Sequence, residues 1–193
     1  WYFLLYLSIL VIKMFKKIIS YIKNLYNPIP DYSSPHGILY KRILNSSYDR
    51  RFYEKIMVPD TLDGRFDLII LHIFIIVKIF KNSNEQNKNF TQKLFDIFML
   101  EVESSYREMG ISDQSFSKKM KVVIESFYGR TKMYDLNFNN NDEFINCLVR
   151  NIWSEDVSKE IFAGELYDFV IQKVKKYNNK SIDEILELSV DGF

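Results

Sequence analysis

The residues best suited to chemistry lie in one short stretch, residues 58–72 (VPDTLDGRFDLIILH). There Arg65 stands among the carboxylates of Asp60, Asp63 and Asp67. One interpretation is a small helical enzyme for an anionic or lipid substrate, in which Asp60, Asp67 and Arg65 would serve as acid, base and anion clamp. A second interpretation is structural, with bidentate bonds from Arg65 to Asp63 and Asp67 that fix the loop. In a third, Arg65 or Asp60 points outward and forms a polar recognition surface.

The rest of the chain offers little catalytic or metal-binding material. His72 lies inside an apolar run and is interpreted as a neutral core residue, whereas His36 is interpreted as a surface residue at a helix start. Neither histidine has a second metal ligand at suitable spacing. The single cysteine, Cys147, excludes an internal disulfide and is expected to be a small buried thiol. We therefore predict no catalytic residue, no metal site and no cofactor, so an enzyme is the weaker interpretation.

Composition indicates one globular domain. The chain has 193 residues, of which 47% are hydrophobic and 26% charged, so a substantial core is expected. Lysine and arginine number 26 against 25 acidic residues, so net charge predicts no partner. The part of the chain before Asp60 is nevertheless basic, which suits an anionic surface.

The N-terminal segment has two possible roles. Residues 1–12 form an apolar run shorter than the roughly 20 residues that span a bilayer, and the natural start is expected at Met14. Residues 14–26 have the spacing of an amphipathic helix, which either packs on the core or lies on an anionic membrane surface. For the second alternative, the candidate membrane-contacting residues are Phe15, Lys16, Lys17, Ile18, Ile22 and Lys23.

Helical periodicity dominates from Ser34 onward. The pattern predicts an all-α, single-domain bundle of about seven to nine helices, with residues 68–80 as a buried central helix. We expect an N-terminal segment and linker at 1–33, the helical domain at 34–178, and a short C-terminal helix or tail at 179–193. Gly110 is expected to end a helix in a left-handed conformation, with Ile111 closing back on the last turn. Predicted helix starts are Ser34–Pro35, Asp49, Thr61 or Asp63, Asn89 or Thr91, Asn141, Ser158, and Ser181 with Glu184.

A basic cluster lies near the start of the helix after Gly110. Lys118, Lys119 and Lys121 occupy turns where the helix dipole favours acidic residues, and Arg130 extends the positive charge. The cluster is either an ordinary solvated face or a patch for RNA phosphates, anionic lipid or an acidic protein. No DNA partner is expected. Gly129 would permit close approach of another backbone, with residues 62–80 as the expected neighbour.

Three ordered strings resemble the ubiquinol–cytochrome c chaperone family. They are VPDT-x-DGRFD-x-x-x-LH at residues 58–72, REMG-x-x-D at 107–113 and FYGR at 127–130, and the likeness covers roughly 39–135. The sequence at 111–116 (ISDQSF) departs from the glycine-rich, valine-containing start that relatives commonly have in the lysine-bearing helix.

The resemblance implies a non-enzymatic assembly chaperone for cytochrome b of respiratory complex III, or for another complex III subunit. It also implies the ribosome and a small helical protein as partners, and a bacterial, cytoplasmic location peripheral to the inner membrane. A membrane-peripheral helical interaction module is the alternative. The candidate partner-binding residues are Asp60, Gly64, Arg65, Asp67, Arg107, Lys118, Lys119, Lys121, Tyr128 and Arg130.

Overall fold

A computed structural model describes residues 30–81 and 83–190, and within them all regular elements are helical. This confirms the all-α prediction. The predicted amphipathic segment at 14–26, with its membrane-contacting candidates, lies outside the described residues. The helices are α2 (Pro35–Ser47), α3 (Arg50–Glu54), α4 (Leu62–Phe80), α5 (Glu85–Glu108), α6 (Asp113–Leu136), α7 (Asn141–Ile152), the 3-10 turn η1 (Val157–Lys159), α8 (Glu160–Tyr177) and α9 (Ile182–Leu188).

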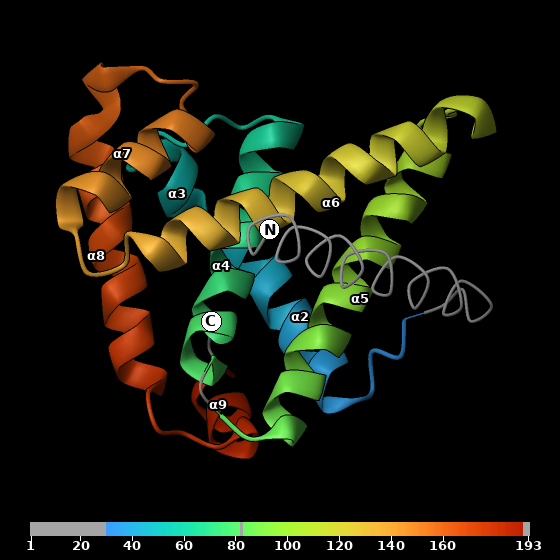
Figure 1. Ribbon diagram of the computed structural model, residues 1–193, viewed down its shortest axis with the longest axis horizontal. Coiled ribbons are helices and arrows are strands. Elements are labelled where there is room, and N and C mark those ends of the chain that lie inside the picture. Colours follow the sequence, from blue (N-terminus) through green and yellow to red (C-terminus); the bar gives the residue numbers. More distant parts are fainter. Residues whose placement is uncertain (1–29, 82, 191–193) are drawn as a thin grey trace, which may run out of the picture. The chain divides into compact units, whose positions relative to one another are not determined.

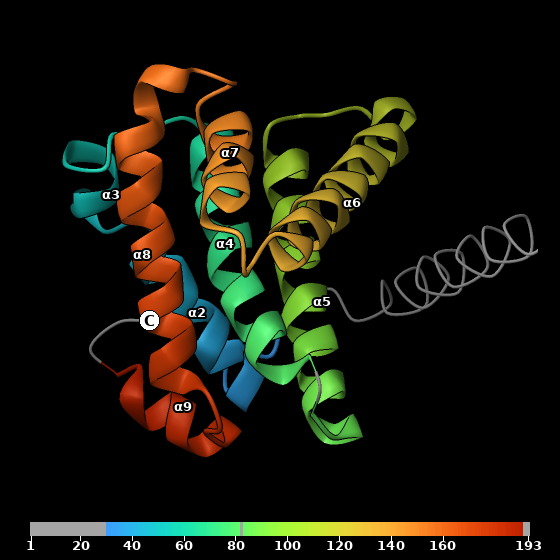
Figure 2. The ribbon, with the colours of Figure 1, turned by 60° about the vertical axis from the view of Figure 1, so that its left-hand side comes forward.

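Helix α4 is the centre of the bundle. It contacts α2, α5, α6, α7 and α8, and nearly every residue from Leu68 to Ile76 is buried. In Figure 1, α6 crosses in front of α4, and Figure 2 shows α8 along another side. The predicted buried central helix is therefore confirmed. Among the described helices, none has the length and apolar content needed to cross a membrane.

Several helix ends follow from local sequence alone. The Ser34 hydroxyl accepts a hydrogen bond from the Gly37 amide at 3.2 Å, with proline at the first helical position. The Asp49 side chain caps α3, and Ser181 with Glu184 forms the predicted capping box of α9.

The end of α5 also matches its prediction. Gly110 has φ = 72°, a conformation that favours glycine, and the Ile111 amide donates to the Tyr106 carbonyl at 3.2 Å. This bond closes the chain back on the last turn of the helix.

Other helix starts were misplaced. Helix α5 begins at Glu85 rather than at Asn89 or Thr91, because the Asn84 side chain accepts from the Asn87 amide at 3.0 Å. Its first turn carries polar residues, so the apolar pattern begins after the helix does. Asn140 rather than Asn141 caps α7, and η1 precedes the start of α8. The predicted starts of α7 and α8 are offset by only one or two residues, whereas the predicted start of α5 falls inside the helix.

The last helix belongs to the compact unit that begins at Tyr32. Arg42 of α2 donates to the Leu186 carbonyl and, at 3.0 Å, to the Ser189 hydroxyl. Lys176 of α8 donates to the Leu188 carbonyl at 3.2 Å. These cations bond the carbonyl end of α9, where the helix dipole favours positive charge.

Candidate functional site

The start of α4 is built around a close backbone approach. The Thr61 hydroxyl caps the helix by accepting from the Gly64 amide at 3.1 Å, which settles the choice between Thr61 and Asp63. A Cβ added at Gly64 would lie only 2.0 Å from the Pro59 carbonyl oxygen. Glycine at this position therefore lets the preceding loop fold over the first turn of α4.

Arg65 pairs with Asp60, not with Asp63 and Asp67 as the structural interpretation expected. Its Nε and one terminal nitrogen each lie 2.7 Å from Asp60 Oδ1, and both side chains are exposed. The guanidinium also lies 5.6 Å from the centre of the Tyr48 ring. Asp67 follows two positions later on the helix, so its side chain is directed to the other face of α4.

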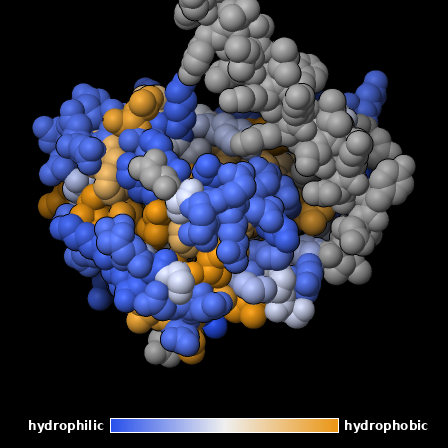
Figure 3. All heavy atoms as spheres, turned by 60° about the horizontal axis from the view of Figure 1, so that its bottom comes forward, coloured by the Kyte–Doolittle hydropathy of each residue, from blue (hydrophilic) through white to orange (hydrophobic). Residues whose placement is uncertain are grey.

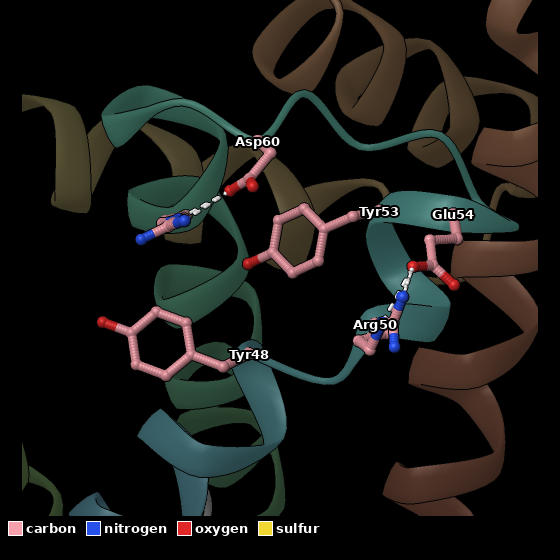
Figure 4. A pocket seen from close by; sticks show the side chains of 6 residues that line it. Tyr48, Arg50, Tyr53, Glu54 and Asp60 are labelled. Carbon is pink, nitrogen blue, oxygen red and sulfur yellow. Dashed lines mark hydrogen bonds and ion pairs between the residues drawn. The ribbon is translucent and has the colours of Figure 1, made fainter.

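Arg65 and Asp60 line an open pocket of about 520 Å³ between α2, α3 and the start of α4. Figure 4 shows Tyr53 beside the Asp60 carboxylate and Tyr48 farther from it, with Arg50 and Glu54 paired on the neighbouring wall. The Tyr53 hydroxyl donates to the Ser47 carbonyl at 2.5 Å. Burial raises the pKa of Tyr53 to about 12, so it stays a neutral donor. The pocket therefore combines two aromatic rings with two internally balanced ion pairs.

Sequence reasoning missed Tyr48, Arg50, Tyr53 and Glu54 as pocket residues. They come from the end of α2 and from α3, whereas Asp60 and Arg65 come from the loop and the start of α4. Periodicity gives no sign that these separate elements meet.

Asp67 and Arg130 form a nearly buried ion pair between α4 and α6. Arg130 Nε lies 2.5 Å from Asp67 Oδ1, and Asp67 is 1% exposed. Burial raises the pKa of Asp67 to about 6, although the positive charge of Arg130 lowers it in part. The guanidinium also lies 5.8 Å from the Phe66 ring centre.

This pair confirms that the strings at 58–72 and 127–130 lie side by side, but the contact differs from the one expected. Gly129 is exposed, and a Cβ there would meet nothing within 4 Å. The expected backbone approach at Gly129 is therefore wrong, and Arg130 makes the contact. Phe127 is buried and Tyr128 half-buried, both against Phe95, as a core ring and a rim ring.

The structure does not bring Asp60, Arg65 and Asp67 together as the enzyme interpretation requires. Asp60 opens onto the pocket, whereas Asp67 is buried against Arg130. The two carboxylates therefore do not face one exposed substrate position. Among residues 30–81 and 83–190, no group of three or more His, Cys, Asp or Glu residues is placed to hold a metal ion.

Arg107 and the lysines occupy a different part of the molecule, where α5 meets α6. Two Arg107 nitrogens contact Glu103 Oε1 at 3.0 and 2.9 Å, and its guanidinium lies 4.6 Å from the Phe116 ring centre. Arg107 thus joins the two helices. The lysines at 118, 119 and 121 are exposed on α6, and Lys121 Nζ lies 3.7 Å from Glu125.

Arg130 does not share that lysine surface. At 1.5 Å per residue it lies about 18 Å along the helix from Lys118, and it turns inward to Asp67. The single basic patch expected from sequence is therefore corrected to a lysine surface, Lys118, Lys119 and Lys121, without Arg130.

His72 and Cys147 have the structural roles predicted for them from the sequence. His72 is fully buried, its Nδ1 lies 2.7 Å from the Leu68 carbonyl, and burial lowers its pKa to about 4. It is therefore a neutral core residue at pH 7. Cys147 is a buried thiol that accepts a contact from the Asn137 amide at 3.4 Å.

Comparisons with known proteins agree with the sequence motifs. A family model described as "Ubiquinol-cytochrome C chaperone" matches residues 54–190. The "Ubiquinol-cytochrome-c reductase complex assembly factor 1" of Xenopus laevis is 24% identical over 129 residues, 67% of this chain and 62% of the frog protein. The chain thus matches less than two thirds of that relative's length.

A solved structure, that of the Cbp3 homolog from Brucella abortus, has the same fold with a TM-score of 0.68. It is 27% identical in sequence, and the match covers 91% of this chain and 92% of that one. The resemblance inferred from the motifs is confirmed. The family match also extends past residue 135, beyond which the motifs had shown no dependable likeness.

Proposed function

Because this chain belongs to the ubiquinol–cytochrome c chaperone family, we propose that it is a non-enzymatic chaperone for cytochrome b during assembly of respiratory complex III. The family match over residues 54–190 is the observation that carries this proposal. The naming of the frog relative as a complex III assembly factor supports it. The proposed place of action is the cytoplasmic surface of the inner membrane, with the ribosome and a small helical protein as further partners.

The pocket at the start of α4 is the proposed client-binding site. Aromatic and aliphatic side chains are exposed around its charged residues: Tyr48 is 48% exposed, and Leu62, beside the loop, is 66% exposed. Exposed apolar groups beside polar ones are typical of sites that bind protein segments. Because the ion pairs in the pocket are balanced, the site favours an uncharged segment, as expected for part of a membrane-inserted subunit before insertion.

Removing the exposed part of this site is expected to weaken capture of the client. Arg65→Ala combined with Tyr48→Ala should lower co-purification of cytochrome b about tenfold, because aromatic and arginine side chains commonly dominate protein contacts. Stability should change little, since the Arg65–Asp60 pair is exposed. Pull-down in detergent, with a thermal melt of each variant, measures both effects.

Lys88→Ala is the matched control, because Lys88 forms an exposed ion pair with Glu85 near the start of α5. This variant should capture the client as the wild type does. Equal capture by the double variant, with an unchanged melt, would place the client contact elsewhere.

The lysine surface of α6 is proposed as a second contact, for an acidic partner protein or ribosomal RNA. Charge reversal by Lys118→Glu and Lys121→Glu should weaken co-purification of that partner or of ribosomes. The loss should be greatest at low salt, because at physiological ionic strength dissolved ions screen interactions between charges more than about 8 Å apart. Lys132→Glu, the same change farther along α6, is the control. Similar losses in both variants would indicate a general charge effect rather than a contact at this surface.

A further inference from the structure

Three cations from two helices gather on the side of α8 that faces α3. Arg51 of α3 and Lys173 of α8 lie 5.9 and 5.4 Å from the centre of the Phe169 ring. Lys173 and Lys176 lie 5.9 and 5.2 Å from the centre of the Tyr177 ring. The two rings therefore hold Arg51, Lys173 and Lys176 in one strip, here called the α8 basic strip (Figure 2 shows α3 beside α8).

The three cations of the α8 basic strip lie close enough to repel one another. Asp49 lies 3.7 Å from Arg51, and Glu165 lies one helical turn before Phe169. Burial, together with the positive charges of Lys176 and Arg51, lowers the pKa of Lys173 to about 8. An anion placed among these residues would relieve their mutual repulsion.

Exposed aliphatic residues lie at one end of the strip. The bond from Lys176 Nζ to the Leu188 carbonyl, 3.2 Å long, brings the strip next to the end of α9. Leu188 is 42% exposed and Val190 is 65% exposed. Figure 3, which views the end of the molecule where α9 lies, shows hydrophobic residues at the surface among hydrophilic ones. Cations beside exposed aliphatic side chains are typical of surfaces that lie against lipid headgroups.

We propose that Arg51, Lys173 and Lys176 bind the phosphate groups of anionic phospholipids, with Leu188 and Val190 entering the headgroup region. This inference rests on the proposed action at a membrane surface and assigns a contact within the folded unit. The α8 basic strip suits phospholipid better than single-stranded RNA, because Phe169 is half-buried and Tyr177 buried, so neither ring can stack a base.

The test is sedimentation of the full chain with vesicles of phosphatidylglycerol and phosphatidylcholine. Lys173→Gln with Lys176→Gln should weaken binding by about fivefold for each charge removed, corresponding to about 1 kcal/mol per cation. Lys175→Gln is the matched control, because Lys175 is exposed on the same helix but directed away from Phe169. Inorganic phosphate should raise the pKa of Lys173, measured by NMR of its ammonium group. This titration tests binding of the phosphate group alone, whereas vesicle sedimentation tests binding to a membrane surface.

Equal vesicle binding by the wild type and the double variant would overturn the proposal, as would equal loss in Lys175→Gln. Loss of binding to RNA or polyglutamate, with vesicle binding intact, would assign the strip to another partner. In detergent without a bilayer, the double variant should still capture cytochrome b. If the wild type fails to capture it there, the chaperone proposal fails while the vesicle result stands.

Discussion

Gly64→Ala is expected to lower the free energy of unfolding by about 3 kcal/mol, near the upper end for overpacking substitutions. The added Cβ would lie 2.0 Å from the Pro59 carbonyl oxygen, and this neighbour is backbone, so the loop itself must shift. The shift would pull Thr61 away from the Gly64 amide and displace Asp60 from the pocket. Urea unfolding monitored by circular dichroism measures the loss, and client capture should fall with it.

Gly129→Ala is the matched control for this effect. It is the same substitution inside another helix, at an exposed position where a Cβ meets nothing within 4 Å. Because alanine is favoured over glycine in helices, this variant should be more stable by roughly 0.5–1 kcal/mol. Similar stability changes in the two variants would contradict the close approach at Gly64.

Arg130→Met is expected to cost about 3 kcal/mol at pH 7, because it leaves the Asp67 carboxylate buried without its cation. The pKa of Asp67 should then rise above its present value of about 6. The folded protein would gain a proton that the unfolded chain has released, so the cost should shrink as the pH falls toward 5. Unfolding free energies of wild type and variant at pH 5 and pH 8 measure this difference.

Asp67 should also give the wild type its own pH dependence. Its pKa in the folded state, about 6, lies above its ordinary value of 3.8, so the folded protein binds more protons than the unfolded chain between about pH 4 and 6. Its contribution to stability therefore falls as pH rises through this window. Relative to Asp67→Asn, the wild type should lose stability over that range and stay level above it. A constant difference would contradict the raised pKa of the buried Asp67 carboxyl.

The features that could be predicted from sequence are those decided within a few residues. The Ser34, Thr61 and Ser181 hydroxyls each accept from the amide three positions later, and Gly110 ends a helix through its own φ angle. The unbroken apolar run also indicated that α4 would be covered on all sides.

The partner of each charged residue near α4 could not be predicted in the same way. Arg65 had carboxylates at 60, 63 and 67 within reach along the chain. Arg65 pairs with Asp60 because Asp67 faces α6, where it binds Arg130, a residue distant in the sequence. Tyr48 and Tyr53 enter the pocket for a similar reason, since tertiary packing brings the α2–α3 region against the start of α4.

A role in cytochrome b assembly can be tested with the reduced-minus-oxidised spectrum of membranes from a strain that lacks this gene. We expect a specific loss of the b-type haem signal of complex III, which the wild-type gene restores and the Arg65→Ala, Tyr48→Ala variant restores much less. Haem signals of other respiratory complexes should remain. A deletion strain with normal cytochrome b and normally assembled complex III would contradict the proposed chaperone function.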